Sequence, residues 1–364
     1  MSFFEAYCEL EGALAGSVRY RESMRRHTSF RIGGPAALLI ECATLADLKA
    51  ALAVIREHRL PWVIIGKGSN LLVADEGFEG AVLVLGSEFK RSRLPDVSAG
   101  QALLMAGGGV LLSNLVQEAF KNGYRGLEFA VGIPGTLGGA LFMNAGSADE
   151  WIASVVESLT VLRTDFGVDE ASAAAPPPIA AAPAPAPLDA PAPAAPAAPP
   201  APADVPVPPA PPAAPAHGAD QTPRLLRLDA RKLPWEYRHS GIPRSDIIVE
   251  AGLRVEQGHL VQIRAKMEAS LNRRRKTQPL TVPNAGSVFR NPPGSSAGAL
   301  IDACGLKGYR QGGASISRKH ANFIVNDDNA TAADVVAIIM YVRERVKEEH
   351  GIELQPEIRF IGFN

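Results

Sequence analysis

Two glycine-rich segments contain the residue types of phosphate-binding loops. The first, IIGKGSNLLVADEGFEGAVLVL, begins at Ile64. Five small or polar residues follow its apolar start: Gly66, Lys67, Gly68, Ser69 and Asn70. Neither the P-loop nor the dinucleotide fingerprint is matched, because Gly68 follows Lys67 and Leu71 stands where a third glycine would be. The backbone N–H groups of such a turn can hold a pyrophosphate, and a glycine-stabilised β-turn is the alternative.

The second segment, GLEFAVGIPGTLGGALFMNAG at 126–146, has glycines at 132, 135, 138 and 139. Pro134 stiffens its turn, and the small residues let the backbone approach a flat ligand closely. One such loop favours a glycine-rich helix start packed against a sheet. Two of them, about 60 residues apart, favour one extended dinucleotide bound across both.

Three single residues could do further chemistry. Ser287, in NAGSVFRNP, carries a hydroxyl, although a serine after a glycine is typically a turn residue. The guanidinium of Arg238 could grip a carboxylate through its planar fork, and a surface arginine is the alternative. Glu357 is either a solvent-facing carboxylate on a strand or a buried acid that donates a proton or holds Arg238.

Composition excludes several classes of protein. Lys and Arg total 37 against 38 Asp and Glu, and this net charge of -1 argues against nucleic acid or an anionic membrane as a partner. The three cysteines are widely spaced, which fits a reducing compartment, and the histidines lack ligand spacing, so no metal site is predicted. We expect no signal peptide and no membrane span.

The elements that position these residues are a mixture of strands and helices, so the fold class is α+β. A helix is predicted after Thr44, and buried strands are predicted at PWVIIG and AVLVLG. Further helices are predicted at 111–122, 267–276, 297–304 and 332–350, and a closing strand at 352–362.

A proline- and alanine-rich segment at 171–223 interrupts this pattern. It contains too little apolar side-chain surface to fold, and we interpret it as a disordered, semi-stiff insertion in the tip of a hairpin. Its flanks, SLTVLRTDFG and PRLLRLDARKL, are predicted to be the two hairpin strands. A passive insertion is favoured over a partner-docking arm.

Seven segments in this order resemble the UDP-N-acetylenolpyruvoylglucosamine reductase family. They are HTSFRIGGPA (27–36), GKGSNLL (66–72), the segment at 126–146, YRHS (237–240), AGSVFRNP (285–292), GGASISRKHANFIVN (312–326) and LQPEIRFIG (354–362). Arg238 and Ser287 are only 49 positions apart, as in the shorter type of family member. Departures are Ser147 to Asp149, where the family often has Ala-Tyr-Gly, Arg290 in place of lysine, and the insertion.

The resemblance implies a two-subdomain FAD-binding unit of the vanillyl-alcohol-oxidase type and a C-terminal α+β substrate domain. The expected boundaries are 1–86 for subdomain 1, 87–264 for subdomain 2 with its insertion, and 265–364 for the substrate domain.

The resemblance also implies site residues. Catalysis is expected from Arg238, Ser287 and Glu357. Non-covalent FAD is expected to bind Gly66, Lys67, Gly68, Ser69, Asn70, Leu71, Gly132, Ile133, Pro134, Gly135, Thr136, Gly138, Gly139 and Asn144. The substrate is expected to bind Tyr237, Arg290 and Asn291. The basic run Arg273 to Lys276 is either a solvated helix end or a contact for the phosphates of UDP or NADPH.

The implied reaction is the NADPH-dependent, FAD-mediated reduction of UDP-N-acetylglucosamine enolpyruvate to UDP-N-acetylmuramate, in the cytoplasm of a bacterium building peptidoglycan. Another FAD-dependent oxidase or dehydrogenase of the same fold would explain the two loops but not the later motifs. A non-catalytic sugar-nucleotide-binding scaffold would not need the flavin loops.

Overall fold

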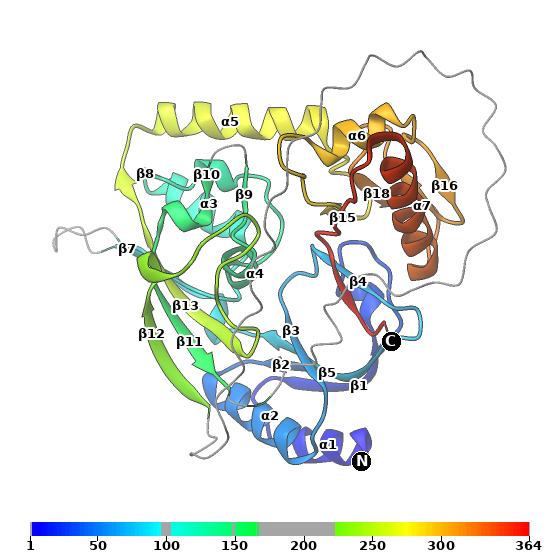
Figure 1. Cartoon of the computed structure of the whole chain (residues 1–364). Coiled ribbons are helices and arrows are strands. Elements are labelled where there is room, and N and C mark those ends of the chain that lie inside the picture. The colour runs from blue at the N-terminus through cyan, green and yellow to red at the C-terminus, as the bar shows by residue number, and fades with distance from the viewer. Residues whose placement is uncertain (1, 96–102, 148–149, 165, 167–222, 364) are drawn as a thin grey trace.

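The computed structural model describes residues 2–95, 103–147, 150–164, 166 and 223–363. Figure 1 shows three α/β units around a common centre, which confirms the predicted α+β class. The lower unit is built on β1, β2, β3 and β5, the left-hand unit on β7 and β11–β13, and the right-hand unit on β15–β18.

The first unit is a four-stranded sheet covered by two helices. Its strand order is β1 (Ser17–Ser23), β2 (Pro35–Cys42), β5 (Phe78–Leu85) and β3 (Trp62–Ile65). The helices are α1 (Phe3–Leu10) and α2 (Leu45–Glu57). Thr44 and Asp47 form a capping box at the start of α2, and the predicted buried strands coincide with β3 and β5.

The second unit is a five-stranded antiparallel sheet with short helices packed on it. Its order is β12 (Arg224–Asp229), β11 (Val156–Arg163), β13 (Asp246–Arg254), β7 (Leu103–Gly107) and β6 (Ser92–Arg93). The smaller elements are α3 (Leu112–Lys121), α4 (Leu137–Phe142), the pair β8 (Tyr124–Arg125) and β14 (Glu256–Gln257), and the hairpin β9 (Gly146–Ser147) and β10 (Glu150–Trp151).

The predicted hairpin around the insertion is confirmed. Strands β11 and β12 pair antiparallel, and Arg163 faces Arg224 at the end nearest the insertion. The insertion predicted at 171–223 lies outside the described residues except for Pro223. The β11–β12 ladder runs without a break from Ser158 and Asp229 to Arg163 and Arg224.

The third unit is a four-stranded sheet with α6 and α7 beside it. Its order is β15 (Asn284–Ser287), β18 (Phe323–Asn326), β17 (Ala314–Ile316) and β16 (Arg310–Gln311). Helix α6 spans Ala297–Ala303, and α7 spans Ala332–His350, as predicted. One face of α7 is buried, and the left-handed Gly351 ends the helix.

Helix α5 (Leu260–Thr277) is longer than the prediction of 267–276. Its first turns lie mostly exposed, and Leu260, Ile263 and Met267 form only a narrow apolar stripe at helical spacing, of which Ile263 and Met267 are buried. Figure 1 shows α5 running along the top from the second unit to the third. The expected boundary between 264 and 265 falls inside this helix and stays a prediction.

The closing segment is a strand over three residues only, not over 352–362. Strand β19 (Arg359–Ile361) pairs in parallel with β4 (Leu71–Val73) of the first unit. Pro356 precedes it and cannot donate to a ladder, which shortens the strand. The chain end thus returns directly to the first glycine-rich loop.

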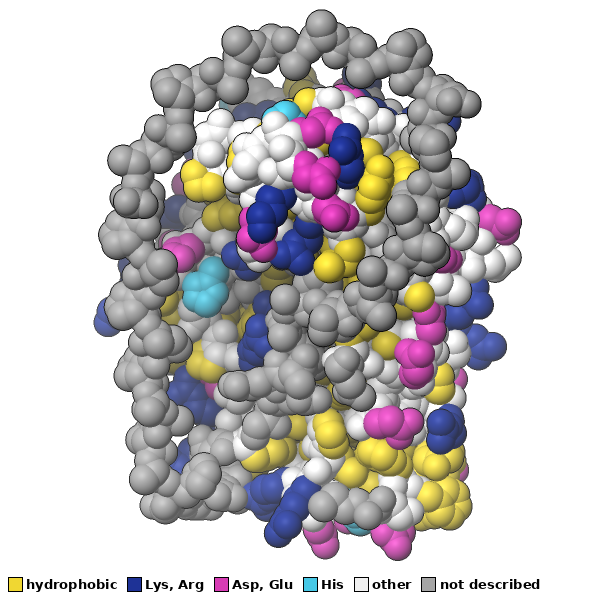
Figure 2. Space-filling model, turned by 45° about the vertical axis from the view of Figure 1, so that its right-hand side comes forward, with side chains coloured by type: hydrophobic (Ala, Val, Ile, Leu, Met, Phe, Trp, Pro, Cys, Tyr) yellow, Lys and Arg dark blue, Asp and Glu magenta, His cyan; other side chains and the backbone are white. Residues whose placement is uncertain are grey.

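In the part of the chain that the structure describes, no helix is long and apolar enough to cross a membrane. Figure 2 shows acidic and basic side chains interspersed over the face in view, consistent with the near-zero net charge.

Candidate active site

A large cleft lies where the three units meet. Its volume is about 1900 Å³, and all three units contribute to its wall. Thirteen of the fourteen residues expected to bind FAD line it: Gly66, Lys67, Gly68, Ser69, Asn70, Leu71, Gly132, Ile133, Pro134, Gly135, Thr136, Gly138 and Gly139. The structure thus brings the two glycine-rich loops, far apart in sequence, onto one cavity.

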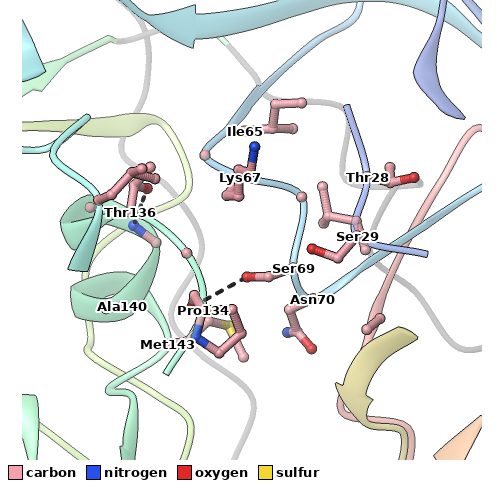
Figure 3. A pocket seen from close by; sticks show the side chains of 18 of the residues that line it. Thr28, Ser29, Ile65, Lys67, Ser69, Asn70, Pro134, Thr136, Ala140 and Met143 are labelled. Carbon is pink, nitrogen blue, oxygen red and sulfur yellow. Dashed lines mark hydrogen bonds between the residues drawn. The ribbon is translucent and has the colours of Figure 1, made fainter. Parts of the chain in front are cut away.

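The first loop turns sharply after β3 (Figure 3). Gly68 has φ +65, and a Cβ there would collide with the carbonyl oxygen of His27. The hydroxyl of Ser69 donates to the carbonyl of Pro134 at 3.5 Å, which joins the two loops. Close approach and a left-handed backbone explain why glycine is needed here.

The second loop leads into α4. Thr136 caps this helix, since its hydroxyl accepts the N–H of Gly139 at 3.4 Å. The N–H groups of Leu137 and Gly138 donate to the carbonyls of Val110 and Gly108. The helix-start interpretation is therefore correct, and the same turn also forms the cleft wall opposite the first loop.

These loops fit a dinucleotide. Among the hydrogen bonds formed within the described ranges, none uses the backbone N–H of Gly68, Ser69 or Asn70, although these residues line the cleft. Unpaired N–H groups in a turn are donors for a pyrophosphate. Lys67 adds a cation beside them, and the cleft volume exceeds the 300–1,000 Å³ typical of small-ligand sites.

Arg238 and Glu357 form an ion pair on the cleft wall. The Nε of Arg238 lies 2.6 Å from Oε1 of Glu357, and both side chains are largely buried. The Nε–H itself has no hydrogen-bond partner within the described chain, so this nitrogen contributes to the pair through its charge. The hydroxyl of Tyr237 donates to the other oxygen, Oε2, at 3.3 Å.

The burial of Glu357 excludes the solvent-facing interpretation. Only 8% of the residue is exposed, and burial raises the pKa of its carboxyl although Arg238, Tyr237 and Arg290 act to lower it. A carboxyl in this state can hold a proton at a higher pH than an exposed glutamate.

The backbone of Glu357 is fixed on both sides. Its N–H donates to the carbonyl of Val288 at 2.7 Å, and its carbonyl accepts the side-chain amide of Asn70 at 3.3 Å. Because Ser287 precedes Val288 and lines the same cleft, the hydroxyl and the carboxyl belong to neighbouring backbone segments. Gly286, which precedes Ser287, has φ +78. Ser287 therefore follows a left-handed turn, in line with its position after a glycine.

Four expected residues lie outside the cleft wall that the described residues form. The side chain of Asn144 bonds the carbonyl of Glu236 and the N–H of Ala153 instead. Asn291 accepts the N–H of Ala297, Arg290 is exposed, and Tyr237 reaches the site through Glu357. These roles stay predictions.

Sequence patterns did not single out three residues around the site, although one of them, Arg274, belongs to the basic run for which a phosphate contact was an alternative. Arg274 of α5 is 8% exposed and lines the cleft, and burial lowers its pKa. Burial likewise lowers the pKa of Arg359 to about 10, and its guanidinium lies 4.7 Å from the ring of Phe142. Trp151 packs edge-on against Tyr237. The basic run at 273–276 gave a signal for Arg274, whereas Trp151 gave none.

A cleft lined by unpaired turn amides, glycines and a buried acid–arginine pair fits a nucleotide cofactor. Two family models match: the FAD binding domain over residues 36–165 and the C-terminal domain of UDP-N-acetylenolpyruvoylglucosamine reductase over residues 278–361. The class is thus an FAD-binding oxidoreductase.

Full-length relatives narrow this class. A UDP-N-acetylenolpyruvoylglucosamine reductase of Heliobacterium modesticaldum is 40% identical over 95% of this chain and 91% of its own length. One of Moorella thermoacetica is 38% identical over 97% and 96%. The crystal structure of the reductase from Thermus caldophilus covers 96% of this chain and 99% of its own, with 30% identity and a TM-score of 0.67. The chain belongs to the UDP-N-acetylenolpyruvoylglucosamine reductase family.

Proposed function

We propose that the chain reduces UDP-N-acetylglucosamine enolpyruvate to UDP-N-acetylmuramate with NADPH and FAD. The observation that carries this proposal is the buried Arg238–Glu357 pair beside Ser287 on the wall of a cleft that fits FAD. Membership of the reductase family supports the substrate, a small sugar nucleotide, and the bacterial setting. An FAD-dependent oxidase of the same fold remains the second candidate, but it does not account for these three residues.

Bound FAD would supply the relay of a hydride from NADPH to the terminal carbon of the enolpyruvyl alkene. The protein then has two tasks on the substrate. Negative charge that develops on the adjacent carbon and the carboxylate needs stabilisation, and that carbon needs one proton on one face.

Arg238 is proposed to perform the first task. Its guanidinium is permanently charged, lines the cleft and can hold the substrate carboxylate through its fork. The ion pair with Glu357 orients the guanidinium of Arg238 before the substrate binds. Tyr237, bonded to the same glutamate, is proposed to contact the substrate beside it.

Ser287 is proposed to deliver the proton. Its hydroxyl lies on the cleft wall one residue from Val288, whose carbonyl accepts the N–H of Glu357. A hydroxyl is a weak acid, so transfer depends on the charge developing on the substrate and on nearby cations such as Arg290.

Glu357 is proposed to stabilise the same charge when protonated. Burial raises its pKa, which keeps the neutral, donating form present at higher pH. Arg290 and Asn291 are proposed to bind the substrate, and the glycine-rich loops with Asn144 to hold FAD.

Anaerobic mixing tests this proposal. The flavin of the purified protein is first bleached with NADPH and then mixed with the enolpyruvyl substrate. Rapid return of the oxidised flavin spectrum is the expected result. A flavin that stays reduced with this substrate but reoxidises in air would indicate an oxidase of the same fold instead.

A further inference from the structure

The hairpin β9–β10 lies against the segment that carries Arg238. The ring of Trp151, at the end of β10, meets the ring of Tyr237 edge-on, with centroids 5.7 Å apart and planes at 87°. The guanidinium carbon of Arg238 lies 5.6 Å from the Trp151 ring centroid and 5.4 Å from the Tyr237 ring centroid. Arg238 is thus bounded by two aromatic rings and by Glu357.

Arg238 has a strained backbone and, in the described part of the chain, an Nε–H without a hydrogen-bond partner, although its charge is paired with Glu357. Its backbone φ is +57, a conformation that residues other than glycine rarely adopt. Its Nε–H has no hydrogen-bond partner among the described residues. Ring faces can attract a guanidinium without supplying a hydrogen-bond acceptor, so its N–H groups stay available to a substrate carboxylate.

The hairpin is itself built to hold the ring. Trp151 pairs with Gly146, and a Cβ at Gly146 would collide with the indole. The side chain of Asn144 bonds the carbonyl of Glu236 at 2.9 Å and the N–H of Ala153 at 3.2 Å. This amide therefore ties the Glu236–Arg238 segment to the chain just beyond Trp151.

We propose that Trp151 is a positioning residue, which holds the guanidinium of Arg238 toward the carboxylate end of the substrate. The inference rests on the proposed role of Arg238. It gives the indole a function that acts through Arg238 and requires no contact between Trp151 and the substrate.

Trp151→Leu and Trp151→Phe form the matched test. Both keep an apolar side chain against Gly146, but only phenylalanine keeps an aromatic face for Arg238. With Trp151→Leu, flavin reoxidation by the enolpyruvyl substrate is expected to slow by about tenfold, and with Trp151→Phe to stay near the wild-type rate.

The pH dependence of the reoxidation rate distinguishes a specific effect on the position of Arg238 from a general loss of stability. Arg238, Tyr237 and Arg290 all face Glu357 and lower its pKa against the effect of burial. In Trp151→Leu the guanidinium of Arg238 is no longer held near Glu357, so it lowers the pKa of Glu357 less. The fall in reoxidation rate that follows deprotonation of Glu357, here called the Glu357 limb of the pH profile, then moves to higher pH. Trp235→Phe is the control, because Trp235 lies in the same segment but bonds the carbonyl of Ala230. It is expected to change stability and not this limb.

The inference would be overturned if Trp151→Leu and Trp151→Phe showed equal reoxidation rates and neither moved the Glu357 limb of the pH profile. Arg238→Ala distinguishes this from a failure of the proposed function. If Arg238→Ala slows reoxidation and Trp151→Leu does not, only the role of Trp151 is wrong. If Arg238→Ala has no effect, the role of Arg238 is wrong as well.

Discussion

The carboxylate of Glu357 lies 2.6 Å from Nε of Arg238, although the two residues are 119 positions apart and belong to different units of the fold. Breaking a buried pair of this kind leaves an uncompensated charge, which is unfavourable. The short path from Glu357 through Val288 to Ser287 places acid, cation and hydroxyl on one wall of the cleft.

Replacement of Ser287 by alanine should separate the two half-reactions. The variant is expected to keep its flavin and to bleach with NADPH, because the cofactor loops are untouched. Turnover with the enolpyruvyl substrate should fall by about 10²–10⁴-fold, the usual contribution of a positioned proton donor. Stopped-flow absorbance of the flavin measures both steps, and an equal loss in both would instead assign Ser287 a structural role.

Replacement of Glu357 by glutamine should remove a limb from the pH profile. Burial raises the pKa of this carboxyl, so the protonated form is complete at low pH and is lost as pH rises through a value above 4.5. Wild-type reoxidation is therefore expected to decline through that region, and the glutamine variant to be slower by about 10²-fold and free of that decline. A wild-type limb that survives unchanged in Glu357→Gln would assign it to another group.

Replacement of Gly68 by alanine should abolish retention of FAD and lower stability. The added Cβ meets the carbonyl of His27 and is forced into a left-handed backbone at φ +65. Gly305→Ala is the control, since Gly305 has φ +69 with open space around it and should lose only about 1 kcal/mol. Flavin content and Tm measure the difference, and similar values for both variants would contradict the close approach.

Deletion of 171–223 should not lower the Tm. Strands β11 and β12 pair up to Arg163 and Arg224, so the hairpin remains complete. Shortening the connection about tenfold reduces the entropic cost of closing it by roughly 2 kcal/mol at most. A decrease of several degrees in a thermal melt would show that the insertion packs on the domain.

Regular elements were the part of this fold that local sequence could predict. The stripe of α7, the cap at Thr44 and the two β-branched runs each carry their signal within a few residues. The start of α5 carries a weaker signal, because Leu260, Ile263 and Met267 form only a narrow apolar stripe on turns that are otherwise mostly exposed.

Site residues that belong to a sequence motif could be predicted. Site residues whose role depends on contacts between distant parts of the chain could not. The two glycine loops have a recognisable composition, and both line the cleft. The burial of Glu357 depends on pairing with a segment near Ser287, and strand alternation alone left it open. Trp151 meets Tyr237 across 86 positions, and no local pattern encodes that contact.

The most direct test is NADPH consumption by the purified, flavin-loaded protein with and without UDP-N-acetylglucosamine enolpyruvate. NADPH consumption is expected to depend on this substrate and to form UDP-N-acetylmuramate in equal amount. Consumption at the same rate without the substrate, or none in its presence, would contradict the proposed function.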